Sequence, residues 1–214
     1  MVSARSGADP AQRVDAVLFD LLMAVMNSLA IWSEAAGDER AGLAWRDAVT
    51  RRISASPAYV PYEEQVVAAT ADAGVPREAA SELFARWPEI EPWPDSAALA
   101  RLALPYAFVT NCSQTLARVA ADQARLAPRF VLSAEEAGWY KPNPRIYQEA
   151  CRRLPSPPGS TLFVAGSAYD ADGARTAGLP SVLVARRPDE HAERRAASLA
   201  DIVAEIATSG SSRC

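Results

Sequence analysis

The chain has 214 residues, of which 50% are hydrophobic and 22% are charged, a balance that allows a sizeable buried core. Its length exceeds that of most single domains but falls short of two full-sized ones, so one main core with an inserted subdomain is expected. The 22 basic and 26 acidic residues give a net charge of -4, and no sustained basic block is present to attract phosphate backbones. Nucleic acid is therefore not an expected partner.

Cysteine usage and apolar segments bear on the compartment. Cys112, Cys151 and Cys214 are odd in number and far apart, which suits neither a disulfide framework nor a zinc site. Residues 1–13 lack the apolar region of a secretory signal, and no apolar run is long enough to span a bilayer. We therefore expect a cytoplasmic protein that has no membrane partner.

Short apolar runs separated by helical stretches organise most of the chain. Such runs have the length and composition of buried strands, and the first of them ends in a carboxylate, Asp20. This alternation predicts right-handed βαβ units and a doubly wound, Rossmann-like parallel sheet of the α/β class. The expected strands are residues 15–20, 106–110, 130–133, 161–165 and 181–185, with helices at 114–124, 145–154 and 171–177.

Residues 28–94 show helical periodicity without a strand, interrupted at 54–61 and at 87–94. We therefore expect an inserted helical cap at residues 29–93, while residues 1–28 and 94–214 form the Rossmann-like core. The proline-rich segment 154–159 is expected to be a stiff loop, and the tail 208–214 is expected to be frayed.

Polar residues follow the expected strands in clusters along the chain. Because the carboxyl ends of parallel strands share one edge of the sheet, where ligands bind, these clusters can converge on one crevice. A nucleophilic carboxylate needs such neighbours: a lysine that keeps it ionised, donors for the substrate, and a second carboxylate that prepares water. In chain order the clusters are Asp20, then Thr110 and Asn111, then Lys141, then Ser167 with Asp170.

The order of these motifs over residues 14–185 resembles the haloacid dehalogenase (HAD) superfamily, and the likeness is closest to its L-2-haloacid dehalogenases. The resemblance implies that Asp20 attacks C2 of a small 2-haloacid, expels halide and forms an ester that water then cleaves. It further implies that Lys141 keeps Asp20 anionic and that Asp170 activates the water. Ser167 belongs to the same motif, in the place of an asparagine that helps to position Asp170 and the water.

The resemblance also assigns residues to the substrate. Thr110 would bind the substrate carboxylate, while Asn111 and Arg46 would receive the leaving halide. The expected partner is a small 2-substituted carboxylic acid, and the resemblance also allows a homodimer. The expected substrate-binding residues are Leu21, Leu22, Arg46, Thr110, Asn111 and Tyr147.

Two positions argue against the magnesium-dependent phosphatases of the superfamily. Those enzymes need a second aspartate two residues after the nucleophile, where this chain has Leu22, and a magnesium-binding acidic residue where it has Gly166. A hard cation would therefore lack its expected oxygen ligands. The resemblance thus implies a reaction without a metal or any other cofactor.

The expected function is hydrolytic dehalogenation of small L-2-haloacids to 2-hydroxy acids through an ester on Asp20. One alternative keeps this nucleophile but opens a carbon–nitrogen bond of a ring acid such as azetidine-2-carboxylate. Another is a non-catalytic binding protein on the same fold. The substitutions Ala165 and Ser167 allow this reading, because the dehalogenases have serine and asparagine there.

Several of these residues also have structural interpretations. Asp20 could cap the helix that follows it, Asp170 could cap a helix that starts at Ala171, and Arg46 could be a surface group. Cys112 has no histidine partner in any motif and is interpreted as a small loop or core residue, and the only histidine, His191, lies in a polar stretch beyond the last strand. The aromatic residues that could line a pocket are Trp32, Tyr59, Tyr62, Trp93, Tyr147 and Tyr169.

Overall fold

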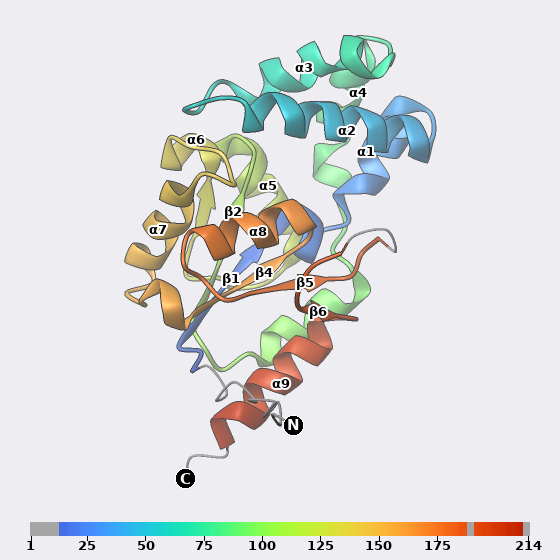
Figure 1. Ribbon diagram of the computed structural model, residues 1–214. Helices are drawn as coiled ribbons and strands as arrows, with labels where there is room; N and C mark the ends of the chain where they lie inside the picture. The colour runs from blue at the N-terminus through green and yellow to red at the C-terminus, as the bar shows by residue number, and fades with distance from the viewer. Residues whose placement is uncertain (1–12, 188–190, 212–214) are drawn as a thin grey trace, which may run out of the picture.

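A parallel sheet of six strands forms the centre of the computed structural model, which describes residues 13–187 and 191–211, without the side chains of 209–211 (Figure 1). The strand order is β3-β2-β1-β4-β5-β6, so the first strand of the chain lies in the middle of the sheet. This order confirms the predicted doubly wound, Rossmann-like α/β fold. The strands are β1 (Ala16–Asp20), β2 (Tyr106–Thr110), β3 (Val131–Ser133), β4 (Thr161–Ala165), β5 (Ser181–Val184) and β6 (Arg195–Ala196).

The apolar runs form strands because the sheet is buried on both faces. Every residue of β1 is buried, and Phe19 pairs with Phe108 of β2 on one side and with Val164 of β4 on the other. The predicted strands are confirmed, and the ends of β1, β3 and β5 differ from the prediction by one residue. The parallel register brings the carboxyl ends of β1, β2 and β4 to the same edge.

The sequence predicted neither β6 nor the helix after it, α9 (Leu199–Ser211). Strand β6 has two residues and no apolar run, so backbone pairing with β5 forms it rather than a hydrophobic pattern. The placement of His191 beyond the last strand is therefore wrong, because β6 follows it. The expected fraying is wrong for residues 208–211, since α9 continues through them and buries an apolar face, while 212–214 lie outside the described residues.

Helices connect the strands of the core, and the last of them corrects a prediction. Helix α8 begins three residues before the predicted start because Ser167 Oγ accepts a hydrogen bond from the backbone N–H of Asp170 at 3.3 Å. Ser167 is the N-cap, so the interpretation of Asp170 as the capping residue is wrong. The segment predicted as a stiff loop ends in a short 3-10 helix, η4 (Pro158–Ser160). The connecting helices are α5 (Gln114–Ala124), α6 (Ala134–Ala137), α7 (Pro144–Arg153) and α8 (Ala168–Thr176).

The segment between β1 and β2 is helical, and Figure 1 shows the helices of residues 28–85 grouped beyond one end of the sheet, while residues 94–101 lie beside α9. The predicted interruptions at 54–61 and 87–94 are confirmed. The chain leaves and re-enters the core side by side, because Met26 and Pro92 form an antiparallel bridge. The division into a cap of residues 29–93 and a core stays a prediction. The elements are η1 (Leu21–Val25), α1 (Ser28–Ala36), α2 (Glu39–Ser54), α3 (Tyr62–Ala73), α4 (Ala79–Ala85), η2 (Trp87–Glu89) and η3 (Pro94–Arg101).

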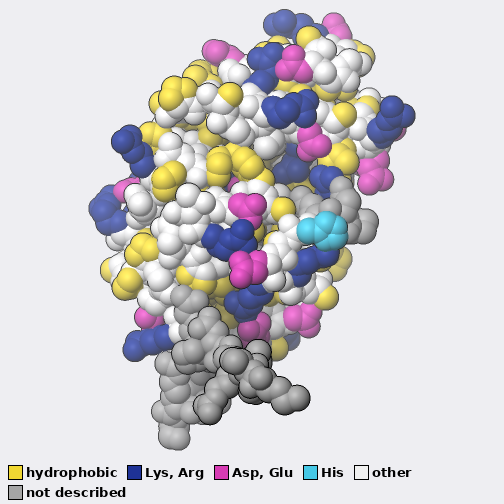
Figure 2. All heavy atoms as spheres, in the orientation of Figure 1, with side chains coloured by type: hydrophobic (Ala, Val, Ile, Leu, Met, Phe, Trp, Pro, Cys, Tyr) yellow, Lys and Arg dark blue, Asp and Glu magenta, His cyan; other side chains and the backbone are white. Residues whose placement is uncertain are grey.

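Helix length and the distribution of surface charge are two features of the described residues that bear on possible partners. No helix within residues 13–187 or 191–211 combines the length and apolar character needed to cross a bilayer. The face drawn in Figure 2 carries acidic and basic side chains interspersed with one another rather than in blocks of one charge. This distribution agrees with the absence of a basic block from the sequence.

Candidate active site

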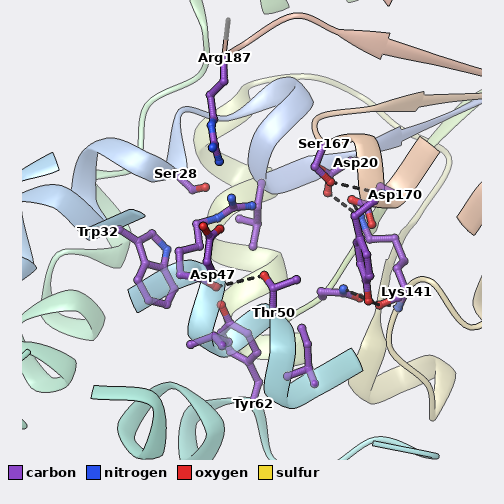
Figure 3. Close-up of a pocket in the computed structure, with 16 residues that line it drawn as sticks. Asp20, Ser28, Trp32, Asp47, Thr50, Tyr62, Lys141, Ser167, Asp170 and Arg187 are labelled. Carbon is purple, nitrogen blue, oxygen red and sulfur yellow. Dashed lines mark hydrogen bonds and ion pairs between the residues drawn. The ribbon is translucent and has the colours of Figure 1, made fainter. Parts of the chain in front are cut away.

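A buried ion-pair cluster lies at the carboxyl edge of the sheet. Lys141 Nζ donates to Asp20 Oδ1 at 2.7 Å and to Asp170 Oδ2 at 2.8 Å. Asp20 ends the central strand β1, Lys141 lies between α6 and α7, and Asp170 lies in the first turn of α8. The exposed fractions of the three residues are 4%, 1% and 6%. Segments 150 residues apart thus meet in one cluster, which Figure 3 shows.

The carboxylate of Asp20 is fixed through both of its oxygens. Oδ1 accepts from Lys141, while Oδ2 accepts from the backbone N–H of Met23 at 3.2 Å and so caps the short helix η1. The capping interpretation of Asp20 is therefore confirmed. It is compatible with a chemical role, because capping turns the carboxylate toward Lys141 and the cavity rather than into the core.

The charges of Lys141 and Asp170 depend on opposing effects. Burial alone would lower the pKa of Lys141, but the carboxylates of Asp170 and Asp20 outweigh it, so the pKa is raised and the ammonium ion persists. Burial raises the pKa of Asp170, which Lys141 partly opposes and the charge of Asp20 reinforces. Asp170 Oδ1 is buried without a hydrogen-bond partner among the described residues. Asp170 is thus the carboxylate better suited to accept a proton.

The main chain of Lys141 is held from outside the cluster. Asn111 Nδ2 donates to Lys141 O at 3.0 Å, and Lys141 N donates to Asn111 Oδ1 at 2.7 Å. The side-chain amide of Asn111 thus binds both the N–H and the C=O of the lysine backbone. The hydroxyl of Tyr169 donates to the same Lys141 oxygen at 2.8 Å. Asn111, which the sequence assigned to the leaving group, therefore also positions the lysine.

A cavity of about 150 Å³ adjoins the cluster (Figure 3). Its volume is below the roughly 300–1,000 Å³ of pockets for drug-sized ligands, so it suits a small molecule. Figure 3 shows Asp20, Lys141 and Asp170 on one side of the view, and Asp47 and Thr50 of α2 on the other. The sequence-predicted site residues that line this cavity are Asp20, Leu22, Arg46, Asn111, Lys141, Ser167 and Asp170.

Among the described residues, three from the predicted substrate-binding set do not line the cavity. Leu21 and Thr110 are fully buried, and Thr110 Oγ1 lies 3.6 Å from the sulfur of Cys112. Tyr147 is also buried, and its hydroxyl donates to Asp170 O at 3.2 Å, so it supports the start of α8. Cys112 is fully buried, which raises the pKa of its thiol to about 12, and its interpretation as a small loop or core residue is confirmed.

The sequence missed several polar residues of the cavity wall. Thr50 lies one helical turn after Arg46 on α2, so helical spacing from Arg46 was a usable signal for Thr50 but not for Asp47, which directly follows Arg46. Arg187 follows β5, and the rule that ligands gather at strand ends could have found it. Of the aromatic residues considered from the sequence, those that line the cavity are Trp32, Tyr62 and Tyr169.

The residues of the site do not fit a magnesium ion. The ammonium of Lys141 lies between Asp20 and Asp170, where a cation would need their oxygens. At Gly166 a Cβ atom would lie 2.3 Å from Met23 Cβ and 2.5 Å from the backbone N of Ala24, so no acidic side chain fits there. Within the described ranges, no group of three or more His, Cys, Asp or Glu side chains is arranged to hold a metal ion.

A solved structure with this fold comes from an enzyme that acts on haloacids. The L-2-haloacid dehalogenase of Xanthobacter autotrophicus, with chloropropionic acid covalently bound, superimposes with a TM-score of 0.78. The match covers 91% of this chain and 98% of that chain at 19% sequence identity. At this identity the likeness shows the fold alone, and it agrees with the fold predicted from the sequence.

Sequence comparisons reach the same family. (S)-2-haloacid dehalogenase 1 of a Pseudomonas species is 30% identical over 119 residues, which are 52% of each chain. (S)-2-haloacid dehalogenase 4A of Burkholderia cepacia is 32% identical over 111 residues, 49% of this chain and 48% of that protein. The matches thus span about half the length of these curated relatives. A family model of the haloacid dehalogenase-like hydrolases matches residues 14–178, and the chain therefore belongs to this hydrolase family, as its motifs predicted.

Proposed function

We propose that the protein is a hydrolase that displaces the substituent at C2 of a small 2-substituted carboxylic acid, with L-2-haloacids as the preferred class. The observation that carries the proposal is the contact of one buried lysine with both Asp20 and Asp170 beside a small cavity. The relatives named as (S)-2-haloacid dehalogenases, and a structure with chloropropionic acid covalently bound, support this choice of substrate. The products would be a 2-hydroxy acid, halide and a proton.

In the first step, an oxygen of Asp20 forms a bond to C2 while the carbon–halogen bond breaks. The halide leaves with the electron pair of that bond, and the configuration at C2 inverts. Lys141 keeps Asp20 anionic and holds its orientation, which is worth more in a water-poor cavity than in solution. Arg46, which lines the cavity from α2, receives the halide.

In the second step, water attacks the carbonyl carbon of the Asp20 ester. Asp170 takes a proton from this water through Oδ1, the oxygen that has no hydrogen-bond partner among the described residues. The bond between that carbonyl carbon and the ester oxygen then breaks, and this oxygen leaves with the product. Asp170 returns its proton to the product oxygen, and the new carboxyl group of Asp20 releases the second proton of the water to solvent, which restores both carboxylates.

The proposal is tested by mass spectrometry of the protein after incubation with racemic 2-chloropropionate. We expect a covalent adduct on Asp20, chloride release, and neither in Asp20→Asn. Asp170→Asn should form the adduct and hydrolyse it at least about a hundredfold more slowly, because general-base catalysis is lost. Wild-type protein that forms no adduct with 2-chloropropionate or chloroacetate would contradict the assignment.

One observation favours a second candidate, the opening of a strained cyclic 2-amino acid. Asp47 lines the cavity next to Arg46, and its carboxylate has no described hydrogen-bond or ion-pair partner. A carboxylate opposes the departure of a halide ion, whereas it attracts a ring ammonium group. Attack by Asp20 on C2 would then break the carbon–nitrogen bond, and the protonated nitrogen would leave as a neutral amine.

Asp47→Asn separates the two candidates. With a cyclic amino acid such as azetidine-2-carboxylate, we expect this variant to lose about tenfold in kcat/KM, while chloride release from 2-chloropropionate stays equal or rises. Thr50→Val, on the same face of α2, serves as the control because it removes a polar group without changing charge. An equal fall in both reactions would show that Asp47 does not recognise the leaving group.

A further inference from the structure

The hydroxyl of Tyr169 connects the helix that forms one wall of the cavity to the lysine of the ion-pair cluster. It donates to Lys141 O at 2.8 Å and lies 2.6 Å from Ser54 Oγ. Ser54 is the last residue of α2, and its hydroxyl also contacts the backbone oxygen of Thr50 one turn earlier. A continuous set of contacts therefore runs from α2 through Tyr169 to Lys141.

The position of the Lys141 backbone determines where its ammonium group lies relative to Asp20 and Asp170, so contacts to Lys141 O affect the cluster. This oxygen accepts from both Asn111 Nδ2 and the Tyr169 hydroxyl. Asn111 lies in the loop at the end of β2, whereas Tyr169 also contacts Ser54 at the end of α2. Groups behind a reacting residue that hold it within about 0.5 Å of its productive place determine how well it works.

Helix α2 also supplies Arg46, Asp47 and Thr50 to the cavity wall. A shift of this helix would move these residues and Ser54 together. Resting on the proposed function, we infer that Tyr169 is a positioning residue. Through its contacts with Ser54 and Lys141 O, it couples the position of α2 against the core to the position of the Lys141 ammonium group between Asp20 and Asp170. The cluster is then fully ordered when α2 lies against the core.

Lys141 is the only lysine in the sequence, so its side chain can be observed selectively. Protein labelled with [15N]lysine gives one side-chain ammonium signal, whose titration reports the Lys141 pKa without any substrate. We expect Tyr169→Phe to lower that pKa, because a displaced ammonium interacts less with the two carboxylates that raise it. We expect kcat for 2-chloropropionate to fall about tenfold, with KM changed less.

Ser54→Ala tests the coupling to α2. It should change the ammonium signal and kcat in the same direction as Tyr169→Phe but by less, and it should add nothing in the Tyr169→Phe background. The matched control is Tyr106→Phe, which removes a hydroxyl that accepts a hydrogen bond from Ala127 N far from the cluster. Urea denaturation of every variant checks that each one is folded.

A wild-type ammonium signal and wild-type kcat in Tyr169→Phe would overturn the inference. Additive effects of the two variants would overturn the coupling, because independent contacts add. If wild-type protein forms no adduct with any haloacid, the proposed function fails, but the ammonium titration still decides whether Tyr169 positions Lys141. The two failures are therefore distinguishable.

Discussion

The two carboxylates of the cluster differ in how their oxygens are engaged, and this difference supports the separate roles that we propose for them. Both oxygens of Asp20 accept hydrogen bonds, from Lys141 and from the backbone of Met23. Asp170 has one oxygen engaged and one unpartnered among the described residues. Asp20 is thus held in one orientation, as in-line attack requires, while Asp170 can accept a proton from water.

This arrangement predicts the pH dependence of turnover. Asp170 must be ionised to act as a base, and its pKa lies above the ordinary value of about 3.9, mainly because of burial. The rate of ester hydrolysis should therefore fall with decreasing pH earlier than for an exposed aspartate. Lys141 must be protonated, and its pKa lies above the ordinary value of about 10.4. The alkaline limb should therefore lie above that value.

The raised pKa of Lys141 should also make the free energy of unfolding fall at alkaline pH. Its pKa is raised in the folded protein, so its contribution to stability is complete below the ordinary lysine pKa and is lost as the pH rises through the folded value. Stopped-flow rates from pH 4 to pH 11, with urea denaturation at each pH, measure both effects. An acidic limb at the position of an unperturbed aspartate would contradict the role given to Asp170.

The sequence predicted the centre of the site better than its walls. Asp20, Lys141 and Asp170 lie at or shortly after strands, and parallel strands bring such positions to one edge whatever the details of packing. The direction of the Thr110 side chain is harder to predict, because it depends on which face of β2 turns toward the cavity. In the structure the hydroxyl of Thr110 points toward Cys112. Asp47 was missed because the seating of α2 on the core is a tertiary property.

At the scale of elements, the predicted bounds hold where a strand or helix of the core has a clear apolar pattern, although α9 was missed while it also buries an apolar face. The expected strand at residues 161–165 and helix at 114–124 have the predicted bounds for this reason. Strand β6 lacks such a face and was missed, since two residues of backbone pairing leave no periodic signal. The start of α8 was misjudged because Ser167, rather than Asp170, supplies the cap.

Helix α2 carries part of the cavity wall, so its attachment to neighbouring helices should affect both stability and activity. Trp45 is fully buried, donates to Val66 O of α3 at 2.9 Å, and packs edge-on against Trp32. Trp45→Phe removes the indole donor and some packed volume, and it should lower the free energy of unfolding by about 1–3 kcal/mol. KM for the haloacid should rise because Arg46 follows Trp45.

Urea denaturation and steady-state kinetics measure these changes. Trp139→Phe is the matched control, since Trp139 is partly exposed and stacks only with Arg145 among its described aromatic and cationic contacts. Its effect should stay within about 0.5 kcal/mol. Equal effects of the two substitutions would show that α2 does not depend on the bond to α3.

At the scale of the whole molecule, Asp95 joins three distant parts of the chain. Its carboxylate in η3 accepts two hydrogen bonds from Arg186, at 2.8 and 3.0 Å, and one from the backbone N–H of Leu199 at 2.8 Å. Arg186 also donates to Ala24 O at 2.6 Å and stacks on Trp93. The C-terminal helix α9, the end of β5 and the turn after Asp20 are thus tied together.

Replacing Asp95 should therefore be costly even though it lies outside the cavity. The Arg186 side chain is only 8% exposed, so Asp95→Ala leaves a mostly buried guanidinium without its carboxylate. We expect a loss of about 3–5 kcal/mol in the free energy of unfolding. Asp95→Asn should lose less, because an amide oxygen can still accept from Arg186 or Leu199. The rate of adduct formation should fall with stability, since Arg186 also supports Ala24 in the turn after Asp20.

A second arginine–aspartate pair provides the control, because Asp72 contacts Arg52 with side chains that are 42% and 36% exposed. Water solvates both groups when this pair is broken, so Asp72→Ala should change stability by less than about 1 kcal/mol. Urea denaturation of both variants compares the same chemical change at a buried and an exposed site. If the two losses were equal, burial would not govern the Asp95 pair, and the tie between α9 and the turn after Asp20 would have to be carried by apolar packing alone.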